Sequence, residues 1–380
     1  MFQFIQQQTE LDQVLNLMSQ HSIYGIDTEF IKVDTFWPKL GVLQININEQ
    51  VFLLDGTSLD LSTFWHKVFQ AQQNIFHACS EDIDLIYYYS NNKKIENVFD
   101  TQIAMSYLGY GLQVSYQNAL KHVLNIDIAK DQTRSDWLAR PLSSDQLQYA
   151  ANDVLYITQL AEQIKSHLVE KQLYDFVLED CKHLAYEIAQ EVPQDKLFTE
   201  VGNYRHTPKQ LMQLQQLSVW REQMVKALNQ PRSFILKNAT MIDLVEKRPK
   251  NNFQLSQIKG MRPVIVREYG KIILDLLNYL PEPDKWPLRL ARPIKQSSQG
   301  VTLVVDQLIA QVSEQIHVPK EVLMRKKWLN QLYQYVVFQG QAQDLSPYLL
   351  GWRHELLTQP IITLLQQDVD YLSRQMKLSD

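Results

Sequence analysis

All the strand patterns in this chain lie in its first 78 residues, and this uneven distribution limits the possible folds. Apolar and β-branched segments predict strands at 22–30, 41–48, 51–55 and 74–78. Residues 41–48 alternate apolar and polar side chains, and the short gap before 51–55 predicts a hairpin. Helices are expected near 60–71, 80–90, 101–109, 115–124 and 144–169. A hairpin followed by strands that alternate with helices predicts an α/β domain with a mixed sheet.

The rest of the chain has only helical patterns. Residues 191–208, with Pro193 and Pro208, are a candidate linker, and residues 208–280 repeat apolar side chains at helical spacing. A Pro-rich stretch at 281–300 precedes a second helical block at 301–375, with no convincing repeat between the two blocks. We therefore expect an α/β domain followed by two small helical bundles, with boundaries at 1–195, 207–285 and 296–375.

The composition excludes several classes of protein. Glycine and proline together number 25 (11 + 14), and 45% of the 380 residues are hydrophobic, which excludes a collagenous or largely disordered chain. No apolar run approaches the roughly 18 residues of a membrane span, and the first residues lack the features of a signal peptide. Two cysteines, Cys79 and Cys181, are too few for a disulfide scaffold or a cysteine zinc site. We expect a cytoplasmic protein with reduced thiols and no membrane association.

The net charge of −5 conceals a strong asymmetry. Residues 1–195 hold 12 basic and 26 acidic residues, a net charge of −14, whereas residues 196–380 hold 25 and 16, a net charge of +9. Within the second half, residues 205–295 contain 17 basic and 7 acidic residues, a net charge of +10. An acidic part joined to a basic part suggests a metal-binding or catalytic region coupled to a polyanion-binding region. A basic solvated helical face is the alternative.

Three acidic motifs are candidates for the chemistry. Asp27 and Glu29 lie at the end of the first predicted strand, where residues i and i+2 point to the same face, and two such carboxylates repel each other unless a cation lies between them. Asp82, next to Glu81 and Asp84, follows the strand at 74–78. Tyr149 and Asp153 are one turn apart on a predicted helix. Each motif alone has an ordinary structural explanation, such as a solvated strand end or acidic residues at a helix N-terminus.

Together the motifs resemble the exonuclease superfamily with four acidic residues, Asp-Glu-Asp-Asp, in the subgroup that has a tyrosine in its third motif. The local sequences are similar to those of the bacterial ribonuclease D family: Ile26–Phe30, His77–Asp82, Phe99–Gln102, Ser135–Leu142 and Tyr149–Asp153. Residues 207–280, with Trp220, Arg221 and Pro231, resemble the helicase-and-ribonuclease-D C-terminal (HRDC) domain, and residues 345–357 resemble its second, divergent copy.

The resemblance implies a ribonuclease H-like exonuclease domain followed by two HRDC-like bundles. It implies that Asp27, Glu29, Asp82 and Asp153 bind two divalent cations, Mg²⁺ or Mn²⁺, and that Tyr149 orients the attacking water. Oxygen ligands suit such cations, and two of them can support in-line phosphodiester hydrolysis. The implied activity is 3′–5′ exoribonuclease activity that releases nucleoside 5′-monophosphates, with tRNA precursors and other structured RNA as partners and a monomer as the working form.

Further residues are weaker candidates. Thr28, His77, Arg134 and Arg140 are expected to contact the substrate, although His77 equally fits a structural role and the basic side chains, like Lys130, equally fit solvation. A thiol nucleophile at Cys79, near His77, lacks a third orienting residue.

Two other functions remain as alternatives. A 3′–5′ DNA exonuclease would use the same metal site, because only contacts to the 2′-OH separate the two substrates. A catalytically inactive nucleic-acid-binding adaptor would keep the fold, but the complete set of five residues argues against it. No Gly-rich phosphate loop is present, which excludes an NTP-driven helicase of that type.

Overall fold

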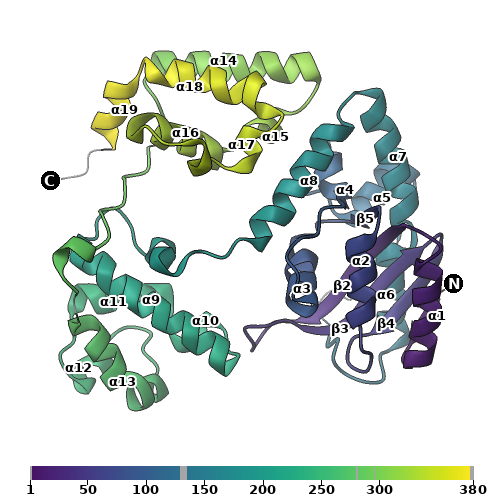
Figure 1. Cartoon of the computed structure of the whole chain (residues 1–380), viewed down its shortest axis with the longest axis horizontal. Helices are drawn as coiled ribbons and strands as arrows, with labels where there is room; N and C mark the ends of the chain where they lie inside the picture. The colour runs from purple at the N-terminus through teal and green to yellow at the C-terminus, as the bar shows by residue number, and fades with distance from the viewer. Residues whose placement is uncertain (1, 129–134, 280, 295, 377–380) are drawn as a thin grey trace. The chain divides into compact units, whose positions relative to one another are not determined.

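The computed structural model describes residues 2–128, 135–279, 281–294 and 296–376. The chain forms two compact units. Figure 1 labels the helices and strands of both. Unit 1 is drawn from Met1–Ile31, Pro38–Gln190 and Gln296–Val369, and unit 2 from Lys32–Trp37, Glu191–Lys295 and Asp370–Asp380. The three predicted segments thus form two units, because the second helical block packs with the α/β part. The boundaries at 1–195, 207–285 and 296–375 remain predictions.

Unit 1 is built on a mixed sheet, as the sequence predicted. Among the described residues the sheet has the order β1-β4-β3-β2-β5-β6. Strands β2, β3 and β4 pair antiparallel, whereas β1 pairs with β4, β5 with β2, and β6 with β5 in parallel. The strands are β1 (Phe2–Ile5), β2 (Ile23–Ile31), β3 (Lys39–Ile47), β4 (Gln50–Asp55), β5 (Gln73–Phe76) and β6 (Val98–Asp100).

The sequence patterns missed the two edge strands, β1 and β6, which are only four and three residues long. So short a segment has too few residues for a period of two to be recognised. The alternation of apolar and polar side chains in β3 does not mark one buried and one exposed face, since this strand is buried on both faces. One of its buried polar residues, Asn46, forms hydrogen bonds inside the protein: its amide donates to the carbonyls of Val154 and Leu155 at 2.8 and 3.1 Å.

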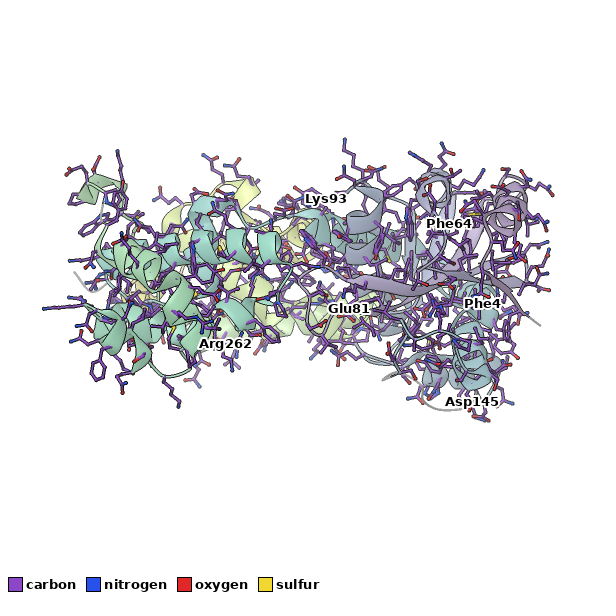
Figure 2. All side chains as sticks on the ribbon, turned by 90° about the horizontal axis from the view of Figure 1, so that it is seen from below. Phe4, Phe64, Glu81, Lys93, Asp145 and Arg262 are labelled. Carbon is purple, nitrogen blue, oxygen red and sulfur yellow. The ribbon has the colours of Figure 1, made fainter. Side chains whose placement is uncertain are left out.

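Helices cover the sheet of unit 1. Helix α6 packs against β2, β3 and β4, α7 packs against β2 and β5, and α8 packs against β6. In chain order the helices are α1 (Gln8–Met18), α2 (Ser62–Gln70), α3 (Ser80–Ser90), α4 (Thr101–Tyr107), α5 (Tyr116–Leu124), α6 (Ser144–Leu155), α7 (Ile157–Glu170) and α8 (Tyr174–Ala189). Large apolar side chains such as Phe64 of α2 fill the core and are fully buried (Figure 2).

The predicted helix at 144–169 was wrong in one respect, because the structure divides it into α6 and α7. Tyr156 lies between them with φ −109° and ψ 4°. Asn46 provides the physical reason: its amide satisfies two carbonyls in the last turn of α6, which would otherwise need continued helix or a cap. At the start of α6, Ser143 is the N-cap residue and forms a capping box with Gln146.

The second helical block belongs to unit 1. It contains α14 (Gln299–Ile316), α15 (Lys320–Leu323), α16 (Lys326–Phe338), η3 (Ala342–Asp344), α17 (Pro347–Leu350), η4 (His354–Thr358) and α18 (Gln359–Gln366). The next helix, α19 (Val369–Gln375), belongs to unit 2 from Asp370 on. Trp352 stacks on Phe176 of α8, with ring centroids 4.5 Å apart. Arg353 is fully buried and forms an ion pair with Asp180, which lies in α8. These contacts explain why the block does not separate as a third unit.

Unit 2 is helical, with a core of apolar side chains that includes Leu217 and Trp220. Its elements are η1 (Gln194–Glu200), α9 (Pro208–Leu228), α10 (Arg232–Ile235), α11 (Asn238–Lys247), α12 (Asn252–Ser256), α13 (Pro263–Asn278) and η2 (Pro283–Lys285). The expected linker at 191–208 is largely a docked segment, because Leu197 and Phe198 of η1 are buried. No described helix in either unit has the length and apolar character needed to cross a membrane.

Candidate active site

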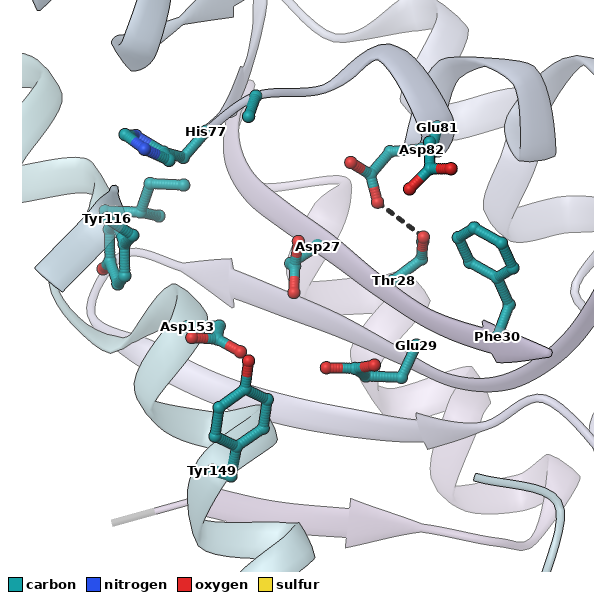
Figure 3. A pocket seen from close by; sticks show the side chains of 12 residues that line it. Asp27, Thr28, Glu29, Phe30, His77, Glu81, Asp82, Tyr116, Tyr149 and Asp153 are labelled. Atoms are coloured by element: carbon teal, nitrogen blue, oxygen red, sulfur yellow. Dashed lines mark hydrogen bonds between the residues drawn. The ribbon is translucent and has the colours of Figure 1, made fainter. Parts of the chain in front are cut away.

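A polar pocket of about 260 Å³ opens where β2, the start of α3 and α6 meet (Figure 3). It collects all five residues that the resemblance implied. The pocket is lined by Asp27, Thr28, Glu29, Phe30, His77, Ala78, Glu81, Asp82, Tyr116, Tyr149, Asp153 and Ile157.

The first two carboxylates come from β2. Asp27 and Glu29 share a face of the strand, as the period of two requires, and both line the pocket. The bridge partner of Asp27 on β3 is Gln44, whose amide lies 3.4 Å from Asp27 Oδ2 and donates to it. Gln44 is fully buried. It therefore helps to orient Asp27, a role that the sequence patterns did not reveal.

The third carboxylate lies in the first turn of α3. The Thr28 hydroxyl donates a hydrogen bond of 2.5 Å to Asp82 Oδ1, which fixes the position of Asp82 against β2 (Figure 3). Before α3, Ala78 has a left-handed φ of 61°, an unusual conformation for a residue other than glycine. The buried Asp100 carboxylate holds this turn by accepting from the backbone N–H groups of Ala78 and Cys79, at 3.1 and 2.8 Å. Asp100 is therefore a second supporting residue. It lies in the segment Phe99–Gln102 that carries part of the resemblance, but the sequence did not reveal its role.

Helix α6 supplies the last two residues. Tyr149 and Asp153 lie one turn apart, and the Tyr149 hydroxyl hydrogen-bonds to the Asp153 carboxylate. The buried ring of Trp137 lies 6.1 Å from the Tyr149 ring, centroid to centroid, and supports it. Carboxylate oxygens of Asp27, Glu29 and Asp153 all lie within 4.8 Å of one another, a spacing at which they could bind one cation.

The electrostatics of the pocket favour bound cations. Burial, and then repulsion from the neighbouring carboxylates, raises the pKa of Asp27 well above its ordinary value. The same causes raise the pKa of Glu29 to about 9. Burial is the main cause that raises the pKa of Asp82 and of Asp153 to about 7. Without a counter-charge these groups cannot all be ionised at neutral pH. A divalent cation on carboxylate oxygens would remove that conflict, so the residues fit hard cations such as Mg²⁺ or Mn²⁺.

The expected substrate contacts have different outcomes. Thr28 lines the pocket, but its hydroxyl is engaged by Asp82. His77 also lines it, and both ring nitrogens have partners: Nε2 donates to the Val114 carbonyl at 2.9 Å, and Nδ1 lies 2.8 Å from the Thr101 hydroxyl. Burial lowers the pKa of His77, so the ring is neutral. A substrate could therefore contact the carbon atoms of the His77 ring but not its nitrogens, which already have partners.

Arg140 does not line the pocket. Its guanidinium binds Asp55 through two hydrogen bonds of 2.5 and 2.9 Å, and its other donors bind the carbonyls of Gly41, Trp137 and Ala139. All five N–H groups of the guanidinium thus have protein acceptors. These donors connect the 137–140 segment to β3 and β4, which gives Arg140 a structural role, and its contact with the substrate stays a prediction. Arg134 and Lys130 lie outside the described residues.

The rejected thiol mechanism also finds no support in the structure. Cys79 is fully buried, and burial, followed by the charge of Asp100, raises the pKa of its thiol well above the ordinary value. A nucleophilic cysteine needs an accessible thiolate.

Comparisons with known families match three segments of the chain. Residues 2–169 match a 3′–5′ exonuclease family, residues 210–277 the HRDC domain, and residues 301–361 the C-terminal HRDC domain of ribonuclease D.

Similar proteins extend over nearly the whole chain. Ribonuclease D of Pseudomonas paraeruginosa is 31% identical over 373 residues, which cover 96% of this chain and 97% of the relative. Ribonuclease D of Haemophilus influenzae is 29% identical, with 93% and 90% covered. The crystal structure of Escherichia coli RNase D, described as an exoribonuclease involved in structured RNA processing, superposes with a TM-score of 0.89 at 23% identity and covers 97% of this chain and 99% of that one.

Proposed function

Because this chain belongs to the ribonuclease D family and is a 3′–5′ exoribonuclease, we propose that its acidic pocket hydrolyses the 3′-terminal phosphodiester bond of RNA with the help of two divalent cations. The observation that carries this proposal is the convergence of four carboxylates and a tyrosine in one pocket. The product would be a nucleoside 5′-monophosphate.

The residues divide into two groups of ligands. Asp27, Glu29 and Asp153, whose oxygens lie within 4.8 Å of one another, would bind one cation. Asp27 and Asp82 would bind the other, with Asp82 held in place by Thr28. When bound, the two cations, Mg²⁺ or Mn²⁺, would activate the attacking water and stabilise the charge on the leaving 3′ oxygen.

The protein's own contribution is orientation. The Tyr149 hydroxyl, hydrogen-bonded to Asp153 and supported by Trp137, would hold the attacking water in line with the scissile bond. Burial, and then the nearby carboxylates, raises the pKa of Tyr149, so its hydroxyl keeps its proton and acts as a hydrogen-bond partner rather than as the base. Gln44 would keep the Asp27 carboxylate aligned for both cations.

We also propose that unit 2 attracts the RNA. It contains the basic stretch 205–295, with a net charge of +10, whereas residues 1–195 carry −14. Arg262 is one of its exposed cations (Figure 2), whereas Arg221 is buried and donates to the Leu236 carbonyl, so it serves the fold. The relative from Escherichia coli, which acts in structured RNA processing, supports structured RNA as the substrate class. We propose tRNA precursors within it, and a cytoplasmic monomer as the working form.

The activity is tested on matched single-stranded RNA and DNA oligonucleotides. We expect Mg²⁺- or Mn²⁺-dependent release of nucleoside 5′-monophosphates from RNA, abolished by EDTA. Equal rates on DNA would support the DNA exonuclease alternative. Binding of RNA with no release of mononucleotides under any of these conditions would instead support an inactive adaptor.

A further inference from the structure

Tyr116, which the proposed mechanism does not use, lines the pocket, and its hydroxyl proton has no acceptor. It is the first residue of α5, and its ring lies 5.5 Å from the His77 ring, centroid to centroid. In Figure 3 it lies on the His77 side of Asp153, away from Tyr149. Its hydroxyl oxygen is buried. The Tyr156 backbone N–H lies near enough to act on that oxygen, but it can only donate to it, and no acceptor takes the hydroxyl proton in the described structure.

An unpaired buried hydroxyl is unusual, because it has lost water without gaining another partner. In the described chain, Tyr116 is the one tyrosine whose buried hydroxyl is unpaired. Other tyrosines of unit 1 have found acceptors: Tyr24 donates to the Met18 carbonyl and Tyr87 to the Ala185 carbonyl. The environment of Tyr116 therefore lacks an acceptor that the fold supplies elsewhere.

The neighbours of Tyr116 do not supply one. Both ring nitrogens of His77 already have partners, Thr101 and Val114. His77 therefore packs against the Tyr116 ring but cannot accept the Tyr116 hydroxyl proton. A phenol is protonated at neutral pH and so can donate, and no carboxylate oxygen of Asp153 or Asp27 accepts from it in the described structure. The phenol therefore has an unused donor at the wall of the pocket. Because its oxygen has almost no exposed surface in the free protein, a substrate oxygen reaches it only after a small shift of the ring.

We infer that the Tyr116 hydroxyl donates a hydrogen bond to an oxygen of the 3′-terminal nucleotide of the RNA, and that substrate binding supplies its missing partner. The acceptor is an oxygen of either the ribose or the scissile phosphate group. A phenol can donate a hydrogen bond to either kind of oxygen. Of these oxygens, only the ribose 2′-OH distinguishes RNA from DNA. This inference rests on the proposed function, and Tyr116 would be an additional substrate-contacting residue.

Tyr116→Phe tests the inference, because it keeps the ring against His77 and removes only the hydroxyl. On an RNA oligonucleotide in Mg²⁺ we expect kcat/KM to fall about 3- to 10-fold, the value of one neutral hydrogen bond. The thermal midpoint of the free protein should stay the same or rise, since the variant loses an unpaired buried oxygen. Tyr186→Phe, at an exposed tyrosine of α8 outside the pocket, is the matched control and should change neither quantity.

A second substrate with a 2′-deoxy terminal nucleotide identifies the acceptor. If the variant is impaired on RNA but equals the wild type on the deoxy substrate, the acceptor is the 2′-OH. If the variant is equally impaired on both, the acceptor is a phosphate oxygen or another oxygen that the two share. An unchanged kcat/KM on both substrates would overturn the inference. Activity of the wild-type protein in the same assay separates that result from a failure of the proposed function.

Discussion

The fully buried guanidinium of Arg353 donates hydrogen bonds of 2.6 and 2.8 Å to the two carboxylate oxygens of Asp180. Arg353 also donates to the carbonyls of Leu323 and Val322, so it joins the second helical block to α8 inside unit 1. The Asp180 carboxylate accepts a further hydrogen bond from Tyr107 of α4 at 2.6 Å. The pair therefore fixes three parts of unit 1 together.

Replacing Arg353 should strongly destabilise unit 1. Arg353→Met leaves the Asp180 carboxylate buried without its counter-charge, which costs about 3–5 kcal/mol. Urea unfolding followed by tryptophan fluorescence measures this change. In the double variant with Asp180→Leu no unpaired charge remains, so it should recover part of the loss. Equal stability of Arg353→Met and the wild type would contradict this role.

Asp27→Asn should abolish turnover by several orders of magnitude, because one charge is removed from the carboxylate proposed to bind both cations. The fold should persist, since the change relieves repulsion among the carboxylates. Mononucleotide release and thermal unfolding in EDTA measure the two effects. More than about a tenth of the wild-type activity would exclude the two-cation assignment.

Tyr149→Phe should have a smaller effect. It keeps the packing against Trp137 but removes the hydroxyl, so kcat should fall roughly 10- to 1000-fold. Affinity for RNA, measured in Ca²⁺ to block turnover, should not change. A loss of affinity at constant kcat would show that Tyr149 binds the substrate instead of orienting water.

The raised pKa values of the carboxylates predict a pH-dependent stability without metal. Asp82 and Asp153 have a folded pKa of about 7 and Glu29 of about 9, all above the ordinary values near 4 for the unfolded chain. Between these values the folded state binds more protons than the unfolded state, so stability falls as the pH rises from about 4 to about 9. In EDTA the thermal midpoint should be lower at pH 8 than at pH 6 from this cause.

Mg²⁺ should reverse this trend, because it replaces the protons. The increase in thermal midpoint on adding Mg²⁺ should be larger at pH 8 than at pH 6. Asp27→Asn, which removes one charge, should reduce the increase at both pH values. An increase independent of pH and of this substitution would mean that Mg²⁺ does not bind at these carboxylates.

Exposed lysines of unit 2 should contribute to the salt dependence of RNA binding. Replacing Lys237, Lys259 and Lys271 with Gln removes three charges from the full chain, whose second helical block must be kept because it covers Asp180. If all three contact phosphates, the slope of log affinity against log salt should become shallower by about 0.7 for each. The control replaces the exposed Lys94, Lys171 and Lys182 of unit 1. Equal slopes in both triple variants would exclude these lysines of unit 2 as RNA contacts.

The parts of the site that follow a local period could be predicted from the sequence. Asp27 and Glu29 are two residues apart on a strand, and Tyr149 and Asp153 are four apart on a helix, so simple geometry placed each pair on one face. Bringing the pairs together with Asp82 required the resemblance to a known family.

The supporting residues could not be predicted because their roles depend on long-range contacts. Gln44 lies 17 residues from Asp27 in the chain, Arg140 lies 85 residues from Asp55, and Arg353 lies 173 residues from Asp180. No period connects such residues. The pairing of Arg353 also explains why two predicted domains form one unit, since a buried charge requires a partner wherever the fold supplies it.

The most direct test of the central claim follows one RNA oligonucleotide labelled at its 5′ end and another labelled at its 3′-terminal nucleotide, both with Mg²⁺. The proposed mechanism predicts that the 3′ label appears at once as a nucleoside 5′-monophosphate, while the 5′ label shortens one nucleotide at a time, and that EDTA or Asp27→Asn stops both processes. Release of 3′-phosphorylated products, internal cleavage, or full activity in EDTA would contradict hydrolysis by cations bound at Asp27, Glu29, Asp82 and Asp153.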